Sequence, residues 1–306
     1  MTISVLIAVY NAENTIKTAI GSILNQTFQD FEIIIIDDKC TDKTIDVIKE
    51  FEDSRIKIIS NEHNMGQIKS LNKGLSFCSG KFIARMDADD ISLPQRFELQ
   101  VQAFEKNPEL VLVGTTGFKS FPNGRVKKLT YYPRNAEALR FFSMFKSPIN
   151  HISVMIRQEY LKNTDIFDES YIIATDWDLW SRYLIKRYKI KILMARCFIY
   201  RVYDTSYSVI NTEIKDKESI KIVKRNVLHY TDLTISSQDA FNIINLHYCK
   251  KLSAKQYIKS LFVWIKIISN YKYDSRRDFI AAVGYDFFLI IAKFLRLLIK
   301  STFKFN

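Results

Sequence analysis

Residues 81–94, KFIARMDADDISLP, place three aspartates directly after a short apolar run. The apolar run predicts the end of a buried strand, and Asp87, Asp89 and Asp90 follow it. Three crowded carboxylates repel one another, so their spacing favours a bound cation. Asp87 and Asp89 fall on the same side of an extended chain and suit Mg²⁺ or Mn²⁺ shared with substrate phosphates. The alternative is an acidic turn before a helix that has Pro94 in its first turn.

The chain before this stretch alternates between apolar runs and helical patterns. Strands are expected at residues 3–10, 32–36, 55–60 and 81–86, with helices between them at residues 15–26, 41–52 and 67–78. Nearly continuous apolar runs are typical of strands buried on both faces of a parallel sheet. This order predicts an open, mostly parallel α/β sheet flanked by helices, which binds ligands at the carboxyl ends of its strands. Asp37, Asp38, Asp87 and Asp89 all fall at such ends.

The pattern is looser after residue 105. Strands are expected at residues 110–115, 151–156 and 191–203, helices at residues 137–145 and 176–186, and a hairpin turn at Asn123-Gly124. We therefore expect three parts: a first half of the sheet at residues 1–105, a mixed second half of the same domain at residues 106–210, and a helical extension at residues 211–306.

The net charge of +12 is concentrated in the extension. Residues 211–306 hold 17 basic and 8 acidic side chains, a net charge of +9, which predicts separate partners for the two parts of the chain. Nucleic-acid binding ranks low, because the basic residues avoid the sheet and no recognition motif is present. Four scattered cysteines without a C-x-x-C motif, and an N-terminus without a basic leader, predict a reduced, cytoplasmic protein without a signal peptide.

Two common phosphate-binding motifs do not occur in the sequence. No G-x-G-x-x-G follows the first strand and there is no G-x-x-x-x-G-K-[ST], which counts against a dinucleotide enzyme and a P-loop nucleotidase. An aspartyl-phosphate hydrolase is a weaker alternative. Its D-x-D spacing occurs at Asp87 and Asp89, but only after the fourth strand.

Several motifs, in order, resemble the inverting family 2 glycosyltransferases with a GT-A fold. The opening SVLIAVYNAENTIKTAIGSILNQTFQDFEIIIIDDKCTDKT resembles the nucleotide-binding start of the family, and ARMDADDISLPQRF resembles its D-x-D region. VMIRQEY, FDES and ATDWDLW resemble its acceptor half. The resemblance spans about residues 2–210. It implies that residues 1–105 bind a nucleotide sugar and that residues 106–210 bind the acceptor.

The resemblance also implies roles for single residues at the donor site. Tyr10 and Asp38 would contact the uracil or ribose of a UDP-sugar. Asp87 would lie near the ribose and the metal, and Asp89 would hold Mn²⁺ or Mg²⁺ on the diphosphate. A divalent cation there stabilises the negative charge that the diphosphate gains as the sugar departs.

Asp176 matches the catalytic base of the family, which deprotonates the acceptor hydroxyl. The alternatives are that Asp176 is only the N-cap of its helix, or that Asp178 is the base, although the place of Asp178 in the motif suggests a structural acid. Two positions depart from the family pattern: Thr175 stands where Glu is common, and Tyr203 where a His is common. Tyr203 is a poor metal ligand, and His151 is not assigned as one.

These motifs predict an inverting, metal-dependent transferase. It would move a hexose or N-acetylhexosamine from a UDP-sugar to a glycan or lipid-linked glycan, in the synthesis of a polysaccharide such as lipopolysaccharide or capsule. The alternative favoured by Thr175 and Tyr203 is an inactive module that binds sugar nucleotides.

The extension contains two amphipathic stretches, at residues 251–266 and 286–304. Their polar stripes hold Lys251, Lys255, Lys259 and Lys266 in the first, and Asp286, Lys293, Arg296, Lys300 and Lys304 in the second. Neither stretch is long and apolar enough to span a bilayer. We expect both helices to lie on the anionic cytoplasmic face of the cell membrane, although their apolar faces could instead pack on each other and on the catalytic domain.

Overall fold

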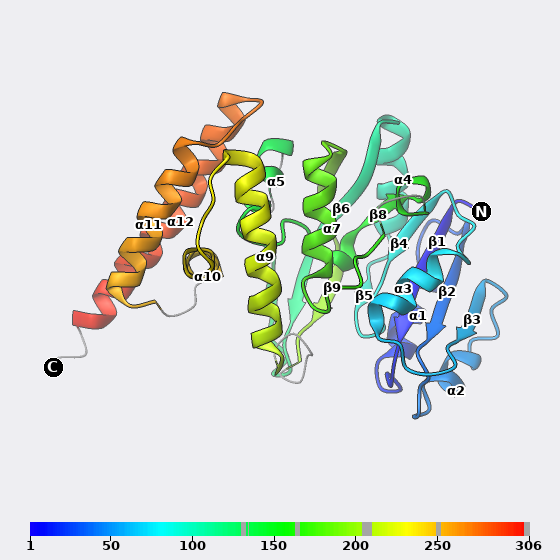
Figure 1. Ribbon diagram of the computed structural model, residues 1–306. Helices are drawn as coiled ribbons and strands as arrows, with labels where there is room; N and C mark the ends of the chain where they lie inside the picture. Colours follow the sequence, from blue (N-terminus) through cyan, green and yellow to red (C-terminus); the bar gives the residue numbers. More distant parts are fainter. Residues whose placement is uncertain (130–132, 134, 163–165, 204–209, 249–251, 303–306) are drawn as a thin grey trace.

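The computed structural model describes residues 1–129, 133, 135–162, 166–203, 210–248 and 252–302, and only the backbone at residues 162, 254, 289 and 292–302. In this part of the chain, nine strands form one sheet in the order β3-β2-β1-β4-β8-β6-β9-β5, with β7 paired to β6. A group of C-terminal helices extends from one side of the sheet domain (Figure 1). The predicted open α/β sheet with a helical extension is confirmed.

The first half of the sheet is the parallel part. It consists of β1 (Ile3–Val9), α1 (Ile16–Leu24), β2 (Phe31–Asp37), α2 (Thr44–Lys49), β3 (Ile56–Ser60), α3 (Gln67–Leu75) and β4 (Phe82–Arg85). β1 pairs in parallel with β2 and β4, and β2 pairs in parallel with β3. Every residue of β1, β2 and β4 is buried, as their apolar runs predict. The loops that follow these strands therefore meet at one edge of the sheet.

The second half of the sheet contains both antiparallel and parallel strand pairs. It consists of β5 (Ile91–Ser92), α4 (Arg96–Lys106), β6 (Leu110–Ser120), β7 (Val126–Lys128), α5 (Ala136–Ser143), the 3-10 turn η1 (His151–Ser153), β8 (Met155–Arg157), α6 (Gln158–Lys162), α7 (Thr175–Ile185) and β9 (Lys189–Arg201). β8 joins the two halves because it pairs antiparallel with both β4 and β6. The predicted hairpin between β6 and β7 is confirmed, and Gly124 adopts a positive φ of 75° in its turn.

The prediction of a strand at residues 151–156 is wrong for residues 151–153. Residues 151–153 form the 3-10 turn, because the Asn150 side chain accepts a hydrogen bond from the Ile152 amide at 3.3 Å. The Ser153 hydroxyl also donates to the Asn150 carbonyl at 2.7 Å. Only Met155–Arg157 pairs as a strand. The turn leaves His151 at the edge of the sheet, beside the loop that follows β4.

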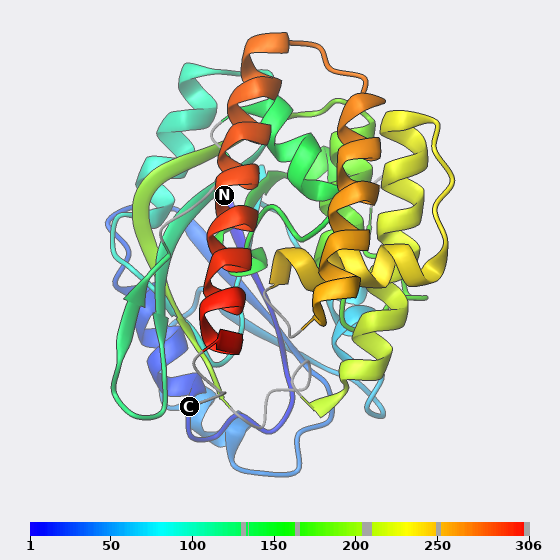
Figure 2. The same cartoon turned by 90° about the vertical axis from the view of Figure 1, so that its left-hand side faces the viewer.

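The extension forms α9 (Thr212–Thr231), α10 (Ser237–Tyr248), α11 (Ala254–Ser269) and α12 (Arg276–Thr302). α11 and α12 lie side by side in both views (Figures 1 and 2). These helices share a buried core with α5 and α7, in which Phe141, Phe142 and Trp177 join Val227, Ile244, Trp264 and Phe279. Among the described helices, none combines the length and the apolarity needed to cross a membrane.

The predicted apolar faces of the extension are only partly exposed. Trp264 and Ile290 lie in the shared core, whereas Phe262 and Phe288 are each 68% exposed. Asp286 is not on an exposed stripe, because it is 2% exposed and accepts hydrogen bonds from His247 Nε2 at 2.8 Å and Trp264 Nε1 at 3.1 Å. Lys251 and Lys304 lie outside the described residues, as do the side chains of Lys293, Arg296 and Lys300.

Candidate active site

A cleft of about 1090 Å³ opens at the carboxyl ends of β1, β2 and β4 and reaches the first turn of α9. The residues predicted for the site all line it: Tyr10, Asp38, Asp87, Asp89 and Asp176. Lys215 of α9 and Tyr248 of α10 line it as well. The extension therefore forms part of the wall of this cleft and is not a separate appendix.

The first end of the cleft is formed by the loops after β1 and β2. Tyr10 is 51% exposed there, whereas Asp38 is 2% exposed. The Asp38 carboxylate accepts hydrogen bonds from the amides of Met65 and Gly66 at 2.7 and 2.9 Å, and from Asn61 Nδ2 at 2.8 Å. Gly66 has a φ of 87°, which favours glycine, and this conformation turns its amide toward the carboxylate. Asp38 thus holds the loop that leads into α3.

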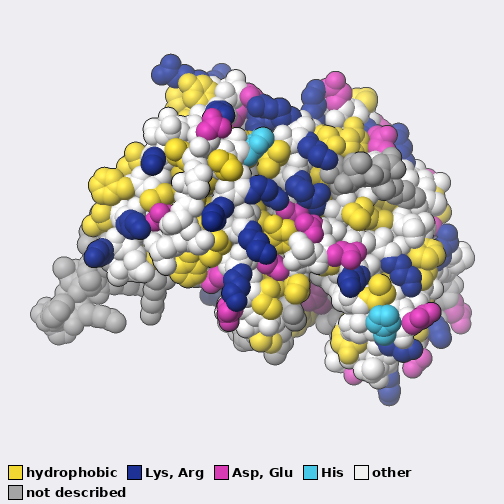
Figure 3. All heavy atoms as spheres, in the orientation of Figure 1, with side chains coloured by type: hydrophobic (Ala, Val, Ile, Leu, Met, Phe, Trp, Pro, Cys, Tyr) yellow, Lys and Arg dark blue, Asp and Glu magenta, His cyan; other side chains and the backbone are white. Residues whose placement is uncertain are grey.

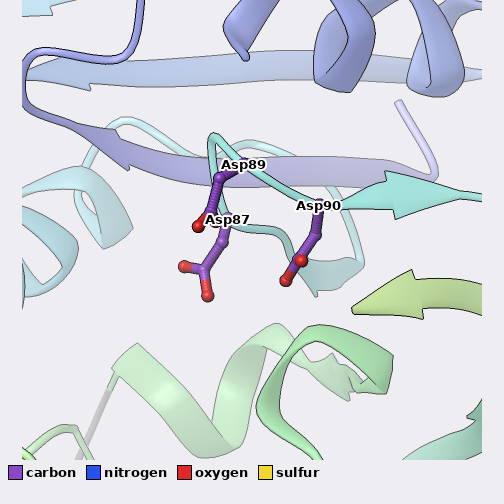
Figure 4. Close-up of side chains that lie close together, drawn as sticks. All are labelled: Asp87, Asp89 and Asp90. Atoms are coloured by element: carbon purple, nitrogen blue, oxygen red, sulfur yellow. The ribbon is translucent and has the colours of Figure 1, made fainter. Parts of the chain in front are cut away.

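The carboxylates of Asp87, Asp89 and Asp90 form a cluster after β4. One oxygen from each carboxylate lies within 4.8 Å of the other two, and all three side chains point to the same side of their loop (Figure 4). One Asp90 oxygen accepts the Arg201 amide hydrogen at 2.7 Å, while its other oxygen is buried without a hydrogen-bond partner. An unpartnered, buried carboxylate oxygen beside two further carboxylates fits a hard divalent cation.

The electrostatics of this cluster agree with a missing positive charge. Burial, and then the charge of Asp87, raise the pKa of Asp89 to about 6. Burial, followed by the charges of Asp87 and Asp89, raises the pKa of Asp90 to about 8. Burial opposes ionisation of Asp87 too, but the nearby Arg85 and His151 charges hold the pKa of its carboxyl well below the usual range. Arg85 also forms an ion pair with Asp87.

His151 links this cluster to the predicted base. Its Nε2 lies 2.5 Å from Asp87 Oδ2, and its Nδ1 lies 3.6 Å from Asp176 Oδ2. Burial alone would lower the pKa of His151, but the adjacent Asp87 and Asp176 carboxylates raise it to about 10. His151 therefore carries a positive charge between two carboxylates. It was not predicted as a site residue, because its place depends on the 3-10 turn and no motif marks it.

Asp176 lies in the first turn of α7 with its carboxylate in the cleft. The N-cap of this helix is Ala174, so the alternative that Asp176 is only an N-cap is wrong. One Asp176 oxygen accepts the Trp177 amide hydrogen at 2.7 Å, and the other lies 3.4 Å from the Ser147 hydroxyl. With 22% of its side chain exposed, Asp176 can reach a substrate.

Asp178 has a different environment from Asp176. Its side chain is 1% exposed and forms ion pairs with Arg182 Nε at 2.8 Å and Arg225 Nη1 at 2.5 Å. A buried carboxylate held by two guanidinium groups is enclosed and has no oxygen turned to a substrate. Asp178 thus ties α7 to α9, as a structural acid does. Of the two residues that depart from the family pattern, Tyr203 lines the cleft and Thr175 is buried in the first turn of α7.

Glu218 of α9 holds the loop in front of the predicted base. Its buried carboxylate accepts hydrogen bonds from the amides of Ile172, Ile173 and Ala174 at 2.7, 2.9 and 2.8 Å. The three residues precede α7, so their amide hydrogens have no hydrogen-bond acceptor within that helix, and Glu218 supplies one. No sequence signal linked Glu218 to Asp176, because the two residues are brought together only by the packing of α9 on α7.

The chain is similar to a known family of proteins. Residues 4–164 match the model of the family described as "Glycosyl transferase family 2". A glycosyltransferase of Haemophilus influenzae is 33% identical over 244 residues, which cover 74% of each chain. An Escherichia coli relative, "UDP-Glc:alpha-D-GlcNAc-diphosphoundecaprenol beta-1,3-glucosyltransferase WfaP", is 30% identical over 67% of this chain and 79% of its own.

Two solved structures share the fold at low sequence identity. TarS of S. aureus in complex with UDP-GlcNAc superposes with a TM-score of 0.61 at 18% identity, over 89% of this chain and 82% of its own. The mannosyltransferase PcManGT of Pyrobaculum calidifontis, in complex with GDP-Man and Mn²⁺, has a TM-score of 0.54 at 11% identity. The match covers 99% of this chain and 80% of the PcManGT chain. The architecture is therefore that of a GT-A glycosyltransferase. This chain belongs to glycosyltransferase family 2. The alternative of an aspartyl-phosphate hydrolase is therefore wrong.

Proposed function

We propose that this glycosyltransferase is an inverting, divalent-metal-dependent enzyme that moves a hexose or N-acetylhexosamine from a UDP-sugar to a lipid-linked glycan. The observation that carries the proposal is the line of side chains from Asp87 through His151 to Asp176 in one cleft. It sets a cation-binding carboxylate cluster beside a partly exposed carboxylate, as transfer from a nucleotide diphosphate requires.

Asp89 and Asp90, together with Asp87, would hold Mn²⁺ or Mg²⁺. Their oxygens are close enough to share one ion, and the unpartnered oxygen of Asp90 supplies a ligand that no protein donor already uses. The ion supplies charge stabilisation to the departing diphosphate. Arg85 and His151 already neutralise much of the Asp87 charge, so Asp89 and Asp90 carry most of the negative charge left for a cation.

Asp176 would act as the base on the acceptor side. The Asp176 carboxylate accepts the proton of the acceptor hydroxyl. At the same time the acceptor oxygen bonds to the anomeric carbon, and the bond from this carbon to the UDP oxygen breaks. Attack on the face opposite UDP inverts the anomeric centre. His151 fixes the place of Asp176 through its charge, and Glu218 fixes the preceding loop. Tyr10 and Asp38 lie at the end of the cleft where the uridine would bind.

The relatives support the acceptor class and the polysaccharide context. WfaP is named for transfer from UDP-Glc to a GlcNAc-diphosphoundecaprenol, and two other relatives are named for amylovoran and O-antigen biosynthesis. We infer that this chain also extends a lipid-linked precursor of a cell-surface polysaccharide.

A panel of nucleotide sugars tests this function. With Mn²⁺ present, the true donor raises the melting temperature by mass action, and UDP is released only when a lipid-linked acceptor is added. A UDP-sugar should stabilise the protein more than the matching GDP-sugar. Stabilisation by no UDP-sugar, or UDP release that does not depend on acceptor, would contradict the proposal. Stabilisation without any transfer would instead support a module that only binds sugar nucleotides.

The exposed part of the extension supports peripheral attachment to the cytoplasmic face of the membrane. Phe262 and Phe288 are each 68% exposed, and Lys255 and Lys266 are exposed on the same helix as Phe262. Figure 3 shows hydrophobic and basic side chains interspersed over the end of the molecule formed by α11 and α12. Exposed aromatic side chains among cations suit the headgroup region of an anionic bilayer.

A further inference from the structure

The cleft also carries basic side chains. Lys119 of β6, Lys128 of β7 and Lys215 of α9 all line it, and we call these three residues the basic arm. Among the described residues, no carboxylate lies within ion-pair distance (4.0 Å) of any of the three ammonium groups. The lysines come from three separate elements, so the fold, and not one local charge run, places all three on one cleft.

The basic arm is a costly arrangement without an anion. Lys119 is half-buried, and burial, followed by the charge of Lys215, lowers the pKa of its ammonium group. Two aromatic rings support the arm: the Lys119 ammonium lies 5.4 Å from the ring centroid of Tyr200, and the Lys215 ammonium lies 5.9 Å from that of Tyr248. Like charges drawn together in a partly desolvated cleft are stabilised when a multivalent anion binds between them.

The lysines of the arm belong to the second half of the sheet and to the extension, whereas Tyr10 and Asp38 follow strands of the first half. Burial raises the pKa of Tyr200 to about 12, and the Asp90, Asp87, Asp89 and Asp176 charges add to this effect, so the ring borders the carboxylates. Lys119 lies over that same ring. Lys119 therefore borders both the carboxylate cluster and Asp176, on the side of the cleft formed by the second half of the sheet and the extension.

We propose that the basic arm binds the diphosphate that links the acceptor sugar to its lipid. This inference rests on the proposed function, because it assigns the anionic part of the same acceptor. When the acceptor hydroxyl lies at Asp176, the diphosphate on the anomeric carbon of the acceptor is about one sugar ring away. The lysines then select for a charged link between sugar and lipid, while the carboxylate cluster holds the other diphosphate, that of the donor, through its cation.

Two acceptors with the same N-acetylglucosamine and the same lipid tail test the proposal. One is joined through a diphosphate and the other through an uncharged ether. In the double variant Lys119→Gln/Lys215→Gln, the KM for the diphosphate acceptor should rise roughly tenfold or more, because two charge-assisted contacts are lost. The KM for the ether acceptor and for the UDP-sugar should not change. Lys221→Gln is the matched control, because Lys221 is exposed on α9 and does not line the cleft.

An unchanged KM for the diphosphate acceptor would overturn the proposal. An equal rise for both acceptors would also overturn it, and an equal rise for the UDP-sugar would assign the lysines to the donor.

A binding measurement decides the question even if the protein transfers sugar to no diphosphate acceptor, an outcome that would contradict the proposed function. Inorganic pyrophosphate is titrated calorimetrically in EDTA, without donor. The double variant should bind it roughly tenfold more weakly than wild type and Lys221→Gln. Equal binding by all three proteins, or no binding by wild type, rejects the basic arm.

Discussion

The proposed donor end and the proposed base end of the cleft are built differently. At the donor end, Asp38 and Asp87 follow the strands that position them within one or two residues. At the base end, the loop before Asp176 is held by Glu218, and α7 is tied to α9 by the Asp178–Arg225 ion pair. Hydrogen bonds between parallel strands thus position the residues at the donor end. At the base end, buried carboxylates that are far away in the sequence hold the loop and the helix. The base should therefore be more sensitive to distant substitutions than the donor site.

The largest effect should follow from Asp176→Asn. Asparagine keeps the size and most hydrogen bonding of the side chain, but it cannot take the acceptor proton. Turnover should fall roughly 10²-fold or more with the UDP-sugar KM little changed. Steady-state kinetics with varied donor and acceptor measure this. Turnover close to wild type would place the base at another residue.

Glu218→Gln tests whether a buried side-chain carboxylate positions the loop before Asp176. Glutamine keeps one acceptor oxygen, but its NH2 group cannot accept the amide hydrogens that the second carboxylate oxygen of Glu218 accepts. The loop should therefore shift, and kcat should fall roughly tenfold at unchanged UDP-sugar KM. The free energy of unfolding should fall by about 1–3 kcal/mol.

Glu213→Gln is the matched control for Glu218→Gln, because its side chain is 82% exposed on the same helix. A melting temperature that drops while kcat per folded enzyme stays normal would make Glu218 merely structural.

These two ends also differ in how far sequence could predict them. The strands, the D-x-D and Asp176 follow from local apolar runs and motifs. His151, the unpartnered Asp90 oxygen and Glu218 do not, because each depends on contacts between segments far apart in the chain. The burial of Asp286 was missed for the same reason, since helical periodicity places a residue on a face but not against His247. Truncation near Asn211 would remove Glu218 and open a core, so it is a poor test of membrane binding.

Metal and pH should act together at the carboxylate cluster. The pKa of Asp89 is about 6 and that of Asp90 about 8, both above the usual range, so the metal-free folded state retains protons that the unfolded state releases. Its stability should therefore fall as pH rises from about 5 to 8. His151, with a pKa raised to about 10, adds in the same direction above its usual pKa, while Asp87 is ionised throughout this range.

Melting temperatures of metal-free wild type and Asp90→Asn between pH 5 and 8 check this linkage, and the variant should lose less stability over the range. Mn²⁺ must displace the same protons, so its stabilising effect should grow with pH. A pH slope that is identical in both proteins would show that Asp90 does not titrate as described.

The smallest effect concerns the membrane. Phe262→Ser together with Phe288→Ser should weaken partitioning onto anionic liposomes by roughly three- to tenfold, because two exposed apolar side chains no longer enter the interface. Sedimentation with liposomes at low salt measures it. Phe77→Ser is the control, because Phe77 is 44% exposed on the sheet domain. Equal sedimentation of all three proteins would remove α11 and α12 as the attachment surface.

The affinity of UDP with and without Mn²⁺ tests the central claim most directly, namely that one cleft joins a metal-held UDP to Asp176. Calorimetric titration is carried out on wild type, Asp89→Asn and Asp176→Asn. Wild type and Asp176→Asn should bind UDP at least tenfold more tightly with Mn²⁺ than in EDTA, and Asp89→Asn should lose this difference. Equal affinity of wild-type protein for UDP in Mn²⁺ and in EDTA would contradict the account.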